Sequence, residues 1–183
     1  MNNNIIIRSE KEKEFEMISH LVKDSFAKGT DYSDGKVEID LINEIRSKKY
    51  YIPNLAFVAE KDGILVGYFL FSRFPISNKY EDEILLLSPV AVNYKYLRQG
   101  IGKIMITKGL KKAKELGFKG VIVEGNPAFY HTIGFKISTT YGIYPSKNCH
   151  LPSPECLMAL ELYKGALSDI KGEVDYSFYK SLI

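Results

Sequence analysis

The stretch Leu85–Leu116 constrains the fold most, because it combines an apolar run, a loop with two glycines and a long amphipathic segment. The apolar run is typical of a strand that is covered on both faces. Pro89 interrupts it, and since proline cannot donate to a sheet ladder, we expect a bulge or a local parting of strands there. The amphipathic segment predicts a helix that opens at residues 100–102 and runs to about Leu116. The whole stretch therefore predicts a buried strand, a short loop and a helix.

Strand and helix patterns alternate through the rest of the chain. We expect strands at Asn4–Ser9, Leu55–Glu60, Ile64–Phe74, Glu83–Val92, Gly120–Glu124, Phe135–Tyr144 and Leu157–Tyr163, and a terminal strand through Val174, Tyr176 and Phe178. Further helices are expected up to about Ala27, from Val37 to about Lys48, and over Asn126–Ile133. A strand, a helix and a second strand in this order imply a right-handed parallel crossover. The sequence thus predicts one α/β (α+β) domain over residues 1–183.

The two glycines at the predicted helix start are suited to an anion. The first turn of a helix has unpaired N–H groups and a partial positive charge, and a glycine lets an anion approach the main chain closely. Arg98 and Lys103 flank the glycines and add charge. A dinucleotide fingerprint would need a third glycine at Met105, and a P-loop would need a hydroxyl after Lys103, so neither motif is present. The alternative that the glycines only ease helix–sheet packing stays open.

The R-Q-G-I-G run at residues 98–102, after a V-A-V strand, resembles the acetyl-CoA pyrophosphate loop of the GNAT superfamily of N-acetyltransferases. Residues 125–135, G-N-P-A-F-Y-H-T-I-G-F, are similar to the family's later G-[DN]-P-x-[FY]-Y-x-x-x-G-F segment. Residues 154–176 resemble the C-terminal end of a bacterial branch of predicted N-acetyltransferases with unassigned substrate. The likeness covers most of the chain from about Leu55 onward. One departure is Leu97, where the family's loop carries a polar residue.

This resemblance implies a GNAT-like fold: a central mixed, twisted sheet of about seven strands with a splayed central pair, flanked by about four helices. It implies acetyl-CoA as the acetyl donor and no metal. In the family the pantetheine arm pairs with the free edge of the central strand like an extra strand. The positions that match the family's cofactor contacts are Val90, Ala91, Val92, Arg98, Gln99, Gly100, Ile101, Gly102, Lys103, Asn126, Phe129 and Tyr130.

Acetyl transfer requires that an amine with a pKa of about 10.4 lose its proton and that the departing thiolate gain one. Tyr130 matches the position of the family's thiolate-protonating tyrosine, and the alternative is a tyrosine at the edge of the core. Many family members carry a glutamate base on the central strand, but the matching residue here is Leu86. Glu124 and Glu83 are the remaining candidates for the base. Solvated carboxylates without a catalytic role, and a water relay, remain alternatives.

We therefore expect an N-acetyltransferase that moves an acetyl group from acetyl-CoA to a primary amine of a small molecule or peptide, by direct attack in a ternary complex. An acyl-CoA-binding regulatory module with little or no turnover is the alternative, and an aminoacyl-tRNA acceptor is a third hypothesis. A net charge of +3 does not indicate nucleic acid as a partner. Two cysteines, no signal peptide and no apolar run of about 18 residues favour a cytoplasmic protein with free thiols and no membrane association. We expect a monomer or a homodimer.

Overall fold

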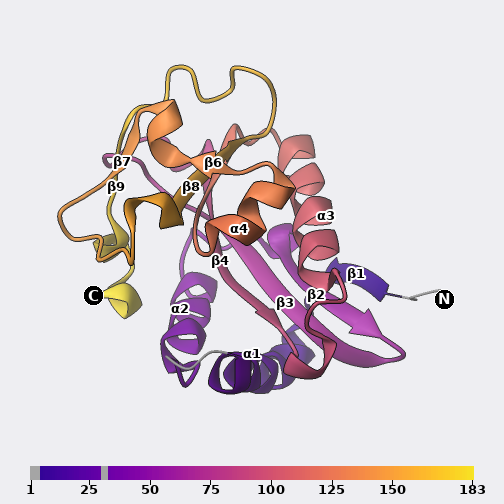
Figure 1. The fold of residues 1–183 in the computed structure, drawn as a ribbon. Coiled ribbons are helices and arrows are strands. Elements are labelled where there is room, and N and C mark those ends of the chain that lie inside the picture. The colour runs from indigo at the N-terminus through magenta and orange to yellow at the C-terminus, as the bar shows by residue number, and fades with distance from the viewer. Residues whose placement is uncertain (1–4, 30–32) are drawn as a thin grey trace. The chain divides into compact units, whose positions relative to one another are not determined.

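The computed structural model describes residues 5–29 and 33–183. The main sheet has the strand order β1-β2-β3-β4-β5-β8-β6, and a smaller sheet pairs β7 with β9. Four α-helices, α1 to α4, accompany these strands in the described part of the chain (Figure 1). The predicted α+β architecture with a mixed seven-stranded sheet is therefore confirmed. The chain divides into two compact units, Met1–Phe71 with Ser88–Gly109, and Ser72–Leu87 with Leu110–Ile183.

The first unit is built on an antiparallel meander. Its elements are β1 (Ile5–Ser9), α1 (Phe15–Gly29), α2 (Lys36–Arg46), β2 (Ala56–Lys61) and most of β3 (Ile64–Arg73). The expected start of the first strand at Asn4 lies outside the described residues. A hairpin turn joins β2 and β3 (Figure 1). Its two turn residues, Asp62 and Gly63, both have positive φ, 52° and 79°, as the tightest hairpin turns require.

The helix after the glycine loop, α3 (Ile101–Glu115), begins and ends close to the prediction. Its first half packs closely on β3 because small residues let the two backbones approach. An added Cβ at Gly67 would lie 2.5 Å from Sδ of Met105, and one at Gly109 would lie 2.6 Å from the ring of Phe69. The position of the helix start relative to β3 is thus fixed by close packing.

The second unit is built around β5 and its neighbours. Its remaining elements are β5 (Gly120–Glu124), α4 (Pro127–Tyr130), β6 (Lys136–Ile137), β7 (Ile143–Pro145), β8 (Leu157–Glu161) and β9 (Gly172–Val174). β5 runs parallel to β4 (Ile84–Val92) and antiparallel to β8. The ladder between β4 and β5 comprises Ile84–Leu86 opposite Gly120–Ile122, whereas β4 itself continues to Val92. The parting of the central strands expected near Pro89 is confirmed.

Two strand predictions in this unit are wrong. The expected strand Phe135–Tyr144 is broken, because a 3-10 turn at Ser138–Tyr141 and a left-handed Gly142, with φ of 74°, follow the short β6. β7 then leaves the main sheet and pairs in parallel with β9. The expected terminal strand ends at Val174, because the Asp175 carboxylate accepts the N–H of Ser177 at 3.0 Å and starts a 3-10 turn. No helix among the described residues is long and apolar enough to cross a membrane.

Candidate active site

The glycine loop lies in the first unit, directly before α3. Arg98 and Gly100 both adopt left-handed backbone conformations, with φ of 60° and 79°. The carbonyl of Gly100 accepts the N–H of Ile104 at 3.1 Å, so the helical hydrogen bonds start there and the N–H groups of the first turn have no acceptor inside the helix. The first turn holds no acidic residue, and an added Cβ at Gly100 would meet nothing within 4 Å. Open space beside unpaired donors fits a phosphate group.

The side chains of the loop divide into exposed and buried ones. Arg98, Gln99 and Lys103 are exposed, so their polar groups are available to an anion. Ile101 is only 1% exposed, so it offers its N–H group rather than its side chain. Leu97, which replaces the family's polar residue, is 45% exposed and carries no group that binds an anion. Anion binding at this loop would depend on backbone N–H groups and on the two cationic side chains.

The end of β4 is bonded on both edges. The N–H of Asn93 donates to Val66 of β3 at 2.9 Å, so by strand alternation the polar backbone groups of Val90 and Val92 face the opposite edge. At this edge the Ser25 hydroxyl of α1 donates to the carbonyl of Val92 at 2.7 Å and accepts its N–H at 3.2 Å. Sequence reasoning missed Ser25, since a serine inside a helix gives no signal for a contact with a strand 67 residues away. The Ser25 hydroxyl thus bonds both backbone polar groups of Val92. Val90, whose backbone groups face the same edge, is therefore better suited to pair with an amide of the pantetheine arm.

Tyr130 ends α4 in the second unit, and its ring is held from several sides. The Asn126 side chain caps α4 by accepting the N–H of Ala128 at 3.0 Å. The Tyr130 ring is 8% exposed and lies 5.0 Å from the ring of Phe129, centroid to centroid. An added Cβ at Gly125 would stand 2.4 Å from Cε2 of this ring. Burial raises the pKa of Tyr130, so its hydroxyl keeps its proton at neutral pH.

The two candidate carboxylates lie at opposite ends of β5. Glu83 forms an ion pair with Lys119, and its carbonyl accepts the Lys119 N–H at 2.8 Å. Glu124 is five residues beyond Lys119, about 16 Å at the rise of a strand. Glu124 lies at the carboxyl end of β5 and is followed by Gly125, against which the Tyr130 ring packs. Glu124, and not Glu83, therefore lies at the end of β5 that leads into α4 and Tyr130.

The surroundings of Glu124 alter its acidity. Glu124 is an exposed residue, and partial desolvation by nearby protein atoms raises the pKa of its carboxyl, while the Tyr176 hydroxyl opposes the rise. Sequence reasoning placed Tyr176 in the predicted terminal strand and gave it no catalytic role. A raised pKa is the direction expected of a carboxylate that accepts a proton near neutral pH.

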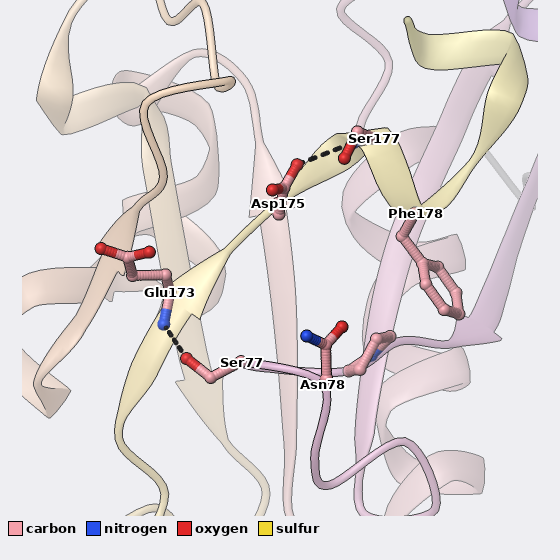
Figure 2. A pocket seen from close by; sticks show the side chains of 7 residues that line it. Ser77, Asn78, Glu173, Asp175, Ser177 and Phe178 are labelled. Carbon is pink, nitrogen blue, oxygen red and sulfur yellow. Dashed lines mark hydrogen bonds between the residues drawn. The ribbon is translucent and has the colours of Figure 1, made fainter.

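A polar pocket of about 410 Å³ opens elsewhere in the second unit (Figure 2). Its lining residues are Pro75, Ser77, Asn78, Glu173, Asp175, Ser177 and Phe178. The Asp175 carboxylate accepts the N–H of Ser177 and the side-chain amide of Asn148, both at 3.0 Å, and hydrogen bonds lower its pKa. None of the residues predicted for the active site lines this pocket. Residues 5–29 and 33–183 contain no cluster of three or more His, Cys, Asp or Glu side chains placed to hold a metal, and both cysteines are free thiols.

Comparison with known proteins agrees with this geometry. An Escherichia coli (strain K12) protein, "Uncharacterized N-acetyltransferase YhbS", is 29% identical over 146 residues, which span 78% of this chain and 83% of that protein. The crystal structure of E. coli YhbS in complex with CoA has a TM-score of 0.81 at 26% identity and covers 94% of this chain and 89% of its own. A GNAT family acetyltransferase from Brucella melitensis in complex with acetyl-CoA shares the fold, with a TM-score of 0.75 at 24% identity over 96% and 97% of the two chains.

The family model described as "Acetyltransferase (GNAT) family" matches residues 16–135. This range is more than half of the chain and includes the β4 edge, the glycine loop and Tyr130. The chain therefore belongs to the acetyltransferase (GNAT) family.

Proposed function

We propose that this chain binds acetyl-CoA and transfers its acetyl group to a primary amine of a small molecule or peptide, by direct attack in a ternary complex. The observation that carries the proposal is the glycine loop, where Gly100 is left-handed, has open space beside it and precedes the unpaired N–H groups of α3. Relatives crystallised with CoA and with acetyl-CoA support this choice of ligand.

The residues of the first unit have binding roles in this proposal. The N–H groups of residues 101–103 and the side chains of Arg98 and Lys103 bind the pyrophosphate. Gln99 adds a polar side chain at the loop. The backbone groups of Val90 pair with an amide of the pantetheine arm, in a position fixed by the bond between Ser25 and Val92. From the second unit, Asn126 and Phe129 serve mainly to hold Tyr130, through the cap of α4 and through ring contact.

The reaction requires two proton movements. Acetyl-CoA supplies the acetyl group as a thioester, whose C–S bond breaks as the amine nitrogen forms the new C–N bond. Glu124 accepts the proton that the attacking amine loses, directly or through a water molecule. Tyr130 donates from its hydroxyl to the departing sulfur. Glu124 ends β5 and Tyr130 ends α4, which follows it, so the acceptor of one proton and the donor of the other come from one short segment of the chain.

Binding is tested by thermal unfolding with and without CoA. At a CoA concentration 100 times its Kd, a ligand that binds only the folded state adds about 2.7 kcal/mol of stability, roughly 5–10 °C for a chain of this size. Gly100→Leu should abolish this protection. Gly63→Leu is the matched control, because Gly63 also has φ of 79° and nothing within 4 Å. Both variants carry the same backbone strain, about 1–2 kcal/mol, so only the loss of protection separates them.

Protection of Gly100→Leu equal to that of the parent, or an absence of protection in the parent at millimolar CoA, would refute the proposed binding loop. Turnover is tested separately by release of the CoA thiol with a library of amines. One observation favours the alternative of an acyl-CoA-binding module: Leu86, at the position of the family's usual glutamate, is 1% exposed and carries no titratable group. Tight acetyl-CoA binding without thiol release across the library would support that alternative.

A further inference from the structure

The polar pocket of the second unit has the size of a ligand site. Its volume of about 410 Å³ falls within the range of about 300–1,000 Å³ that is usual for small-molecule sites. Two segments form its walls: the loop that follows β3, and the segment that leads from β9 into the C-terminal 3-10 turn. None of the residues to which the proposed function gives a role lines this pocket, so its occupant has to be inferred from its own chemistry.

Hydrogen bonds join the two walls of the pocket. The N–H of Ser77 donates to the carbonyl of Glu173 at 2.9 Å, and the N–H of Glu173 donates to the Ser77 hydroxyl at 2.8 Å. Gly172 permits this approach, because an added Cβ there would lie 2.3 Å from the Ser77 hydroxyl oxygen. The Asp175 carboxylate fixes the turn that follows by accepting the N–H of Ser177 at 3.0 Å (Figure 2). The shape of the pocket is therefore set by bonds within the chain.

Asn78 presents a polar side chain to the pocket from a strained backbone. Its φ of 59° and that of Ser77, 48°, both lie in the left-handed region, which residues with a Cβ rarely adopt. Such conformations persist where the surrounding structure imposes them, and they are frequent at ligand sites. The Asn78 amide makes no hydrogen bond with another described residue, and in Figure 2 it points into the space between the two walls. It therefore offers both a donor and an acceptor to a ligand.

The pocket carries negative charge. Its lining includes Glu173 and Asp175 but no lysine, arginine or histidine from the described part of the chain. The Glu173 carboxylate points away from the space between the walls in Figure 2, so Asp175 is the residue that supplies the charge. Hydrogen bonds from Ser177 and from the Asn148 side chain lower the pKa of Asp175, which is therefore ionised at neutral pH. Both donors are neutral, and within residues 5–29 and 33–183 Asp175 forms no ion pair, so its carboxylate lacks a counter-ion.

Phe178 provides an apolar side to the same pocket. Its ring lies edge-on to those of Phe74 and Tyr179, with centroid distances of 5.5 and 5.0 Å, so its position is held by aromatic contacts. A carboxylate, an amide and an aromatic ring together match a small organic cation, because ammonium N–H groups donate to a carboxylate and the adjoining carbon chain packs on a ring. We propose that this pocket binds an amino alcohol, with the primary ammonium group at Asp175 and the hydroxyl at Asn78. This site is independent of the proposed acetyl transfer.

Binding is tested by NMR titration of the full 15N-labelled chain with ethanolamine, in the absence of CoA. The backbone N–H signals of Ser77, Asn78 and Ser177 should shift together and reach saturation. Ethylene glycol, the neutral analogue of the same size, should bind about tenfold more weakly or worse, because hydrogen bonds to charged groups are stronger than those between neutral groups. Shifts that do not saturate, or equal affinity for ethylene glycol, would overturn the proposal.

Two variants and a control assign the binding to this pocket. Asp175→Asn keeps an acceptor for the Ser177 N–H but removes the charge, so ethanolamine affinity should fall about tenfold or more. Asn78→Gly suits the left-handed backbone and removes only the side chain, so affinity should fall about two- to tenfold. Glu155→Gln removes one charge from an exposed residue of the same unit that does not line the pocket, and should bind like the parent. Parent-like affinity in either pocket variant, or an equal loss in Glu155→Gln, would overturn the assignment.

Discussion

Gly125 determines where the Tyr130 ring lies, so Gly125→Ala should act on catalysis from outside the reacting groups. The φ of Gly125 lies outside the left-handed region, so alanine does not strain the backbone there. Its Cβ, however, would stand 2.4 Å from Cε2, 3.1 Å from Cδ2 and 3.3 Å from Cζ of the Tyr130 ring. The three short contacts lie along one edge of the ring and reach Cζ on its axis, so the ring must turn and shift to relieve them.

The size of the effect follows from these distances. Carbon atoms in contact are separated by about 3.5–4.0 Å, so the ring must retreat by roughly 1 Å. A displacement of this size at a reacting group can cost about 10²-fold in rate. Overpacking lowers the free energy of unfolding by about 1–3 kcal/mol. Alanine has less conformational freedom than glycine in the unfolded chain, which raises the free energy of unfolding by about 0.4–1 kcal/mol. We therefore expect a large loss of turnover with a small loss of stability.

The assay is a double-mutant cycle on kcat/KM. Tyr130→Phe alone should lose about 10²–10⁴-fold if the hydroxyl protonates the thiolate. Gly125→Ala with Tyr130→Phe should be no slower than Tyr130→Phe alone, because the displaced hydroxyl is already absent. Gly29→Ala, with nothing within 4 Å of its Cβ, is the control for a glycine substitution and should keep full activity. Full activity of Gly125→Ala, or additive losses in the double variant, would refute the assigned role of Tyr130.

Two further predictions concern the edge of β4 and the base. Ser25→Ala removes the one hydroxyl that bonds both the N–H and the C=O of Val92. This variant should lower the free energy of unfolding by about 1–3 kcal/mol in urea titration and weaken CoA binding, whereas Ser25→Thr, which keeps the hydroxyl, should retain most of both. Unchanged CoA affinity in Ser25→Ala would contradict the role of this edge. Glu124 has a raised folded-state pKa, so its contribution to stability is full below the unfolded-state pKa of about 4.3 and is lost as pH rises through the folded-state value. Glu124→Gln should therefore be more stable than the parent at pH 7 and not at pH 4. It should also flatten the acidic limb of the kcat/KM profile, while the control Glu83→Gln should leave that limb unchanged. If Glu124→Gln keeps the acidic limb of the parent, the titration belongs to the free amine.

The parts of this protein that depend on neighbouring residues in the chain were predictable from the sequence. The glycine loop and the start of α3 were located correctly, because a glycine pair at a strand-to-helix turn and the helical spacing of Met105 and Ala113 are local signals. The parting of β4 and β5 followed from Pro89, which cannot donate to a ladder. These features are set by backbone requirements that few other residues satisfy.

Other features depend on contacts that local patterns do not encode. The Phe135–Tyr144 segment alternates like a strand, but β7 pairs with β9, which lies far along the chain, and so leaves the main sheet. Ser25 and Tyr176 are single polar residues within otherwise ordinary stretches. Ser25 is defined by a bond to Val92, and Tyr176 by a hydroxyl without a partner, and both facts exist only in the folded chain.

Desolvation acts on both proposed proton carriers, but with different consequences for the reaction. At Glu124 it raises the pKa toward the working pH, which makes the carboxylate a stronger acceptor for the amine's proton. At Tyr130 it raises a pKa that already exceeds that of a thiol, about 8.5, so complete transfer of the proton to sulfur becomes less favourable. In the proposed mechanism Tyr130 therefore contributes, before its proton moves, by donating a hydrogen bond to the sulfur as negative charge develops on it. An enzyme of this kind should show a rate that depends on pH through Glu124 and the acceptor amine, with no loss of activity from ionisation of Tyr130 below about pH 10.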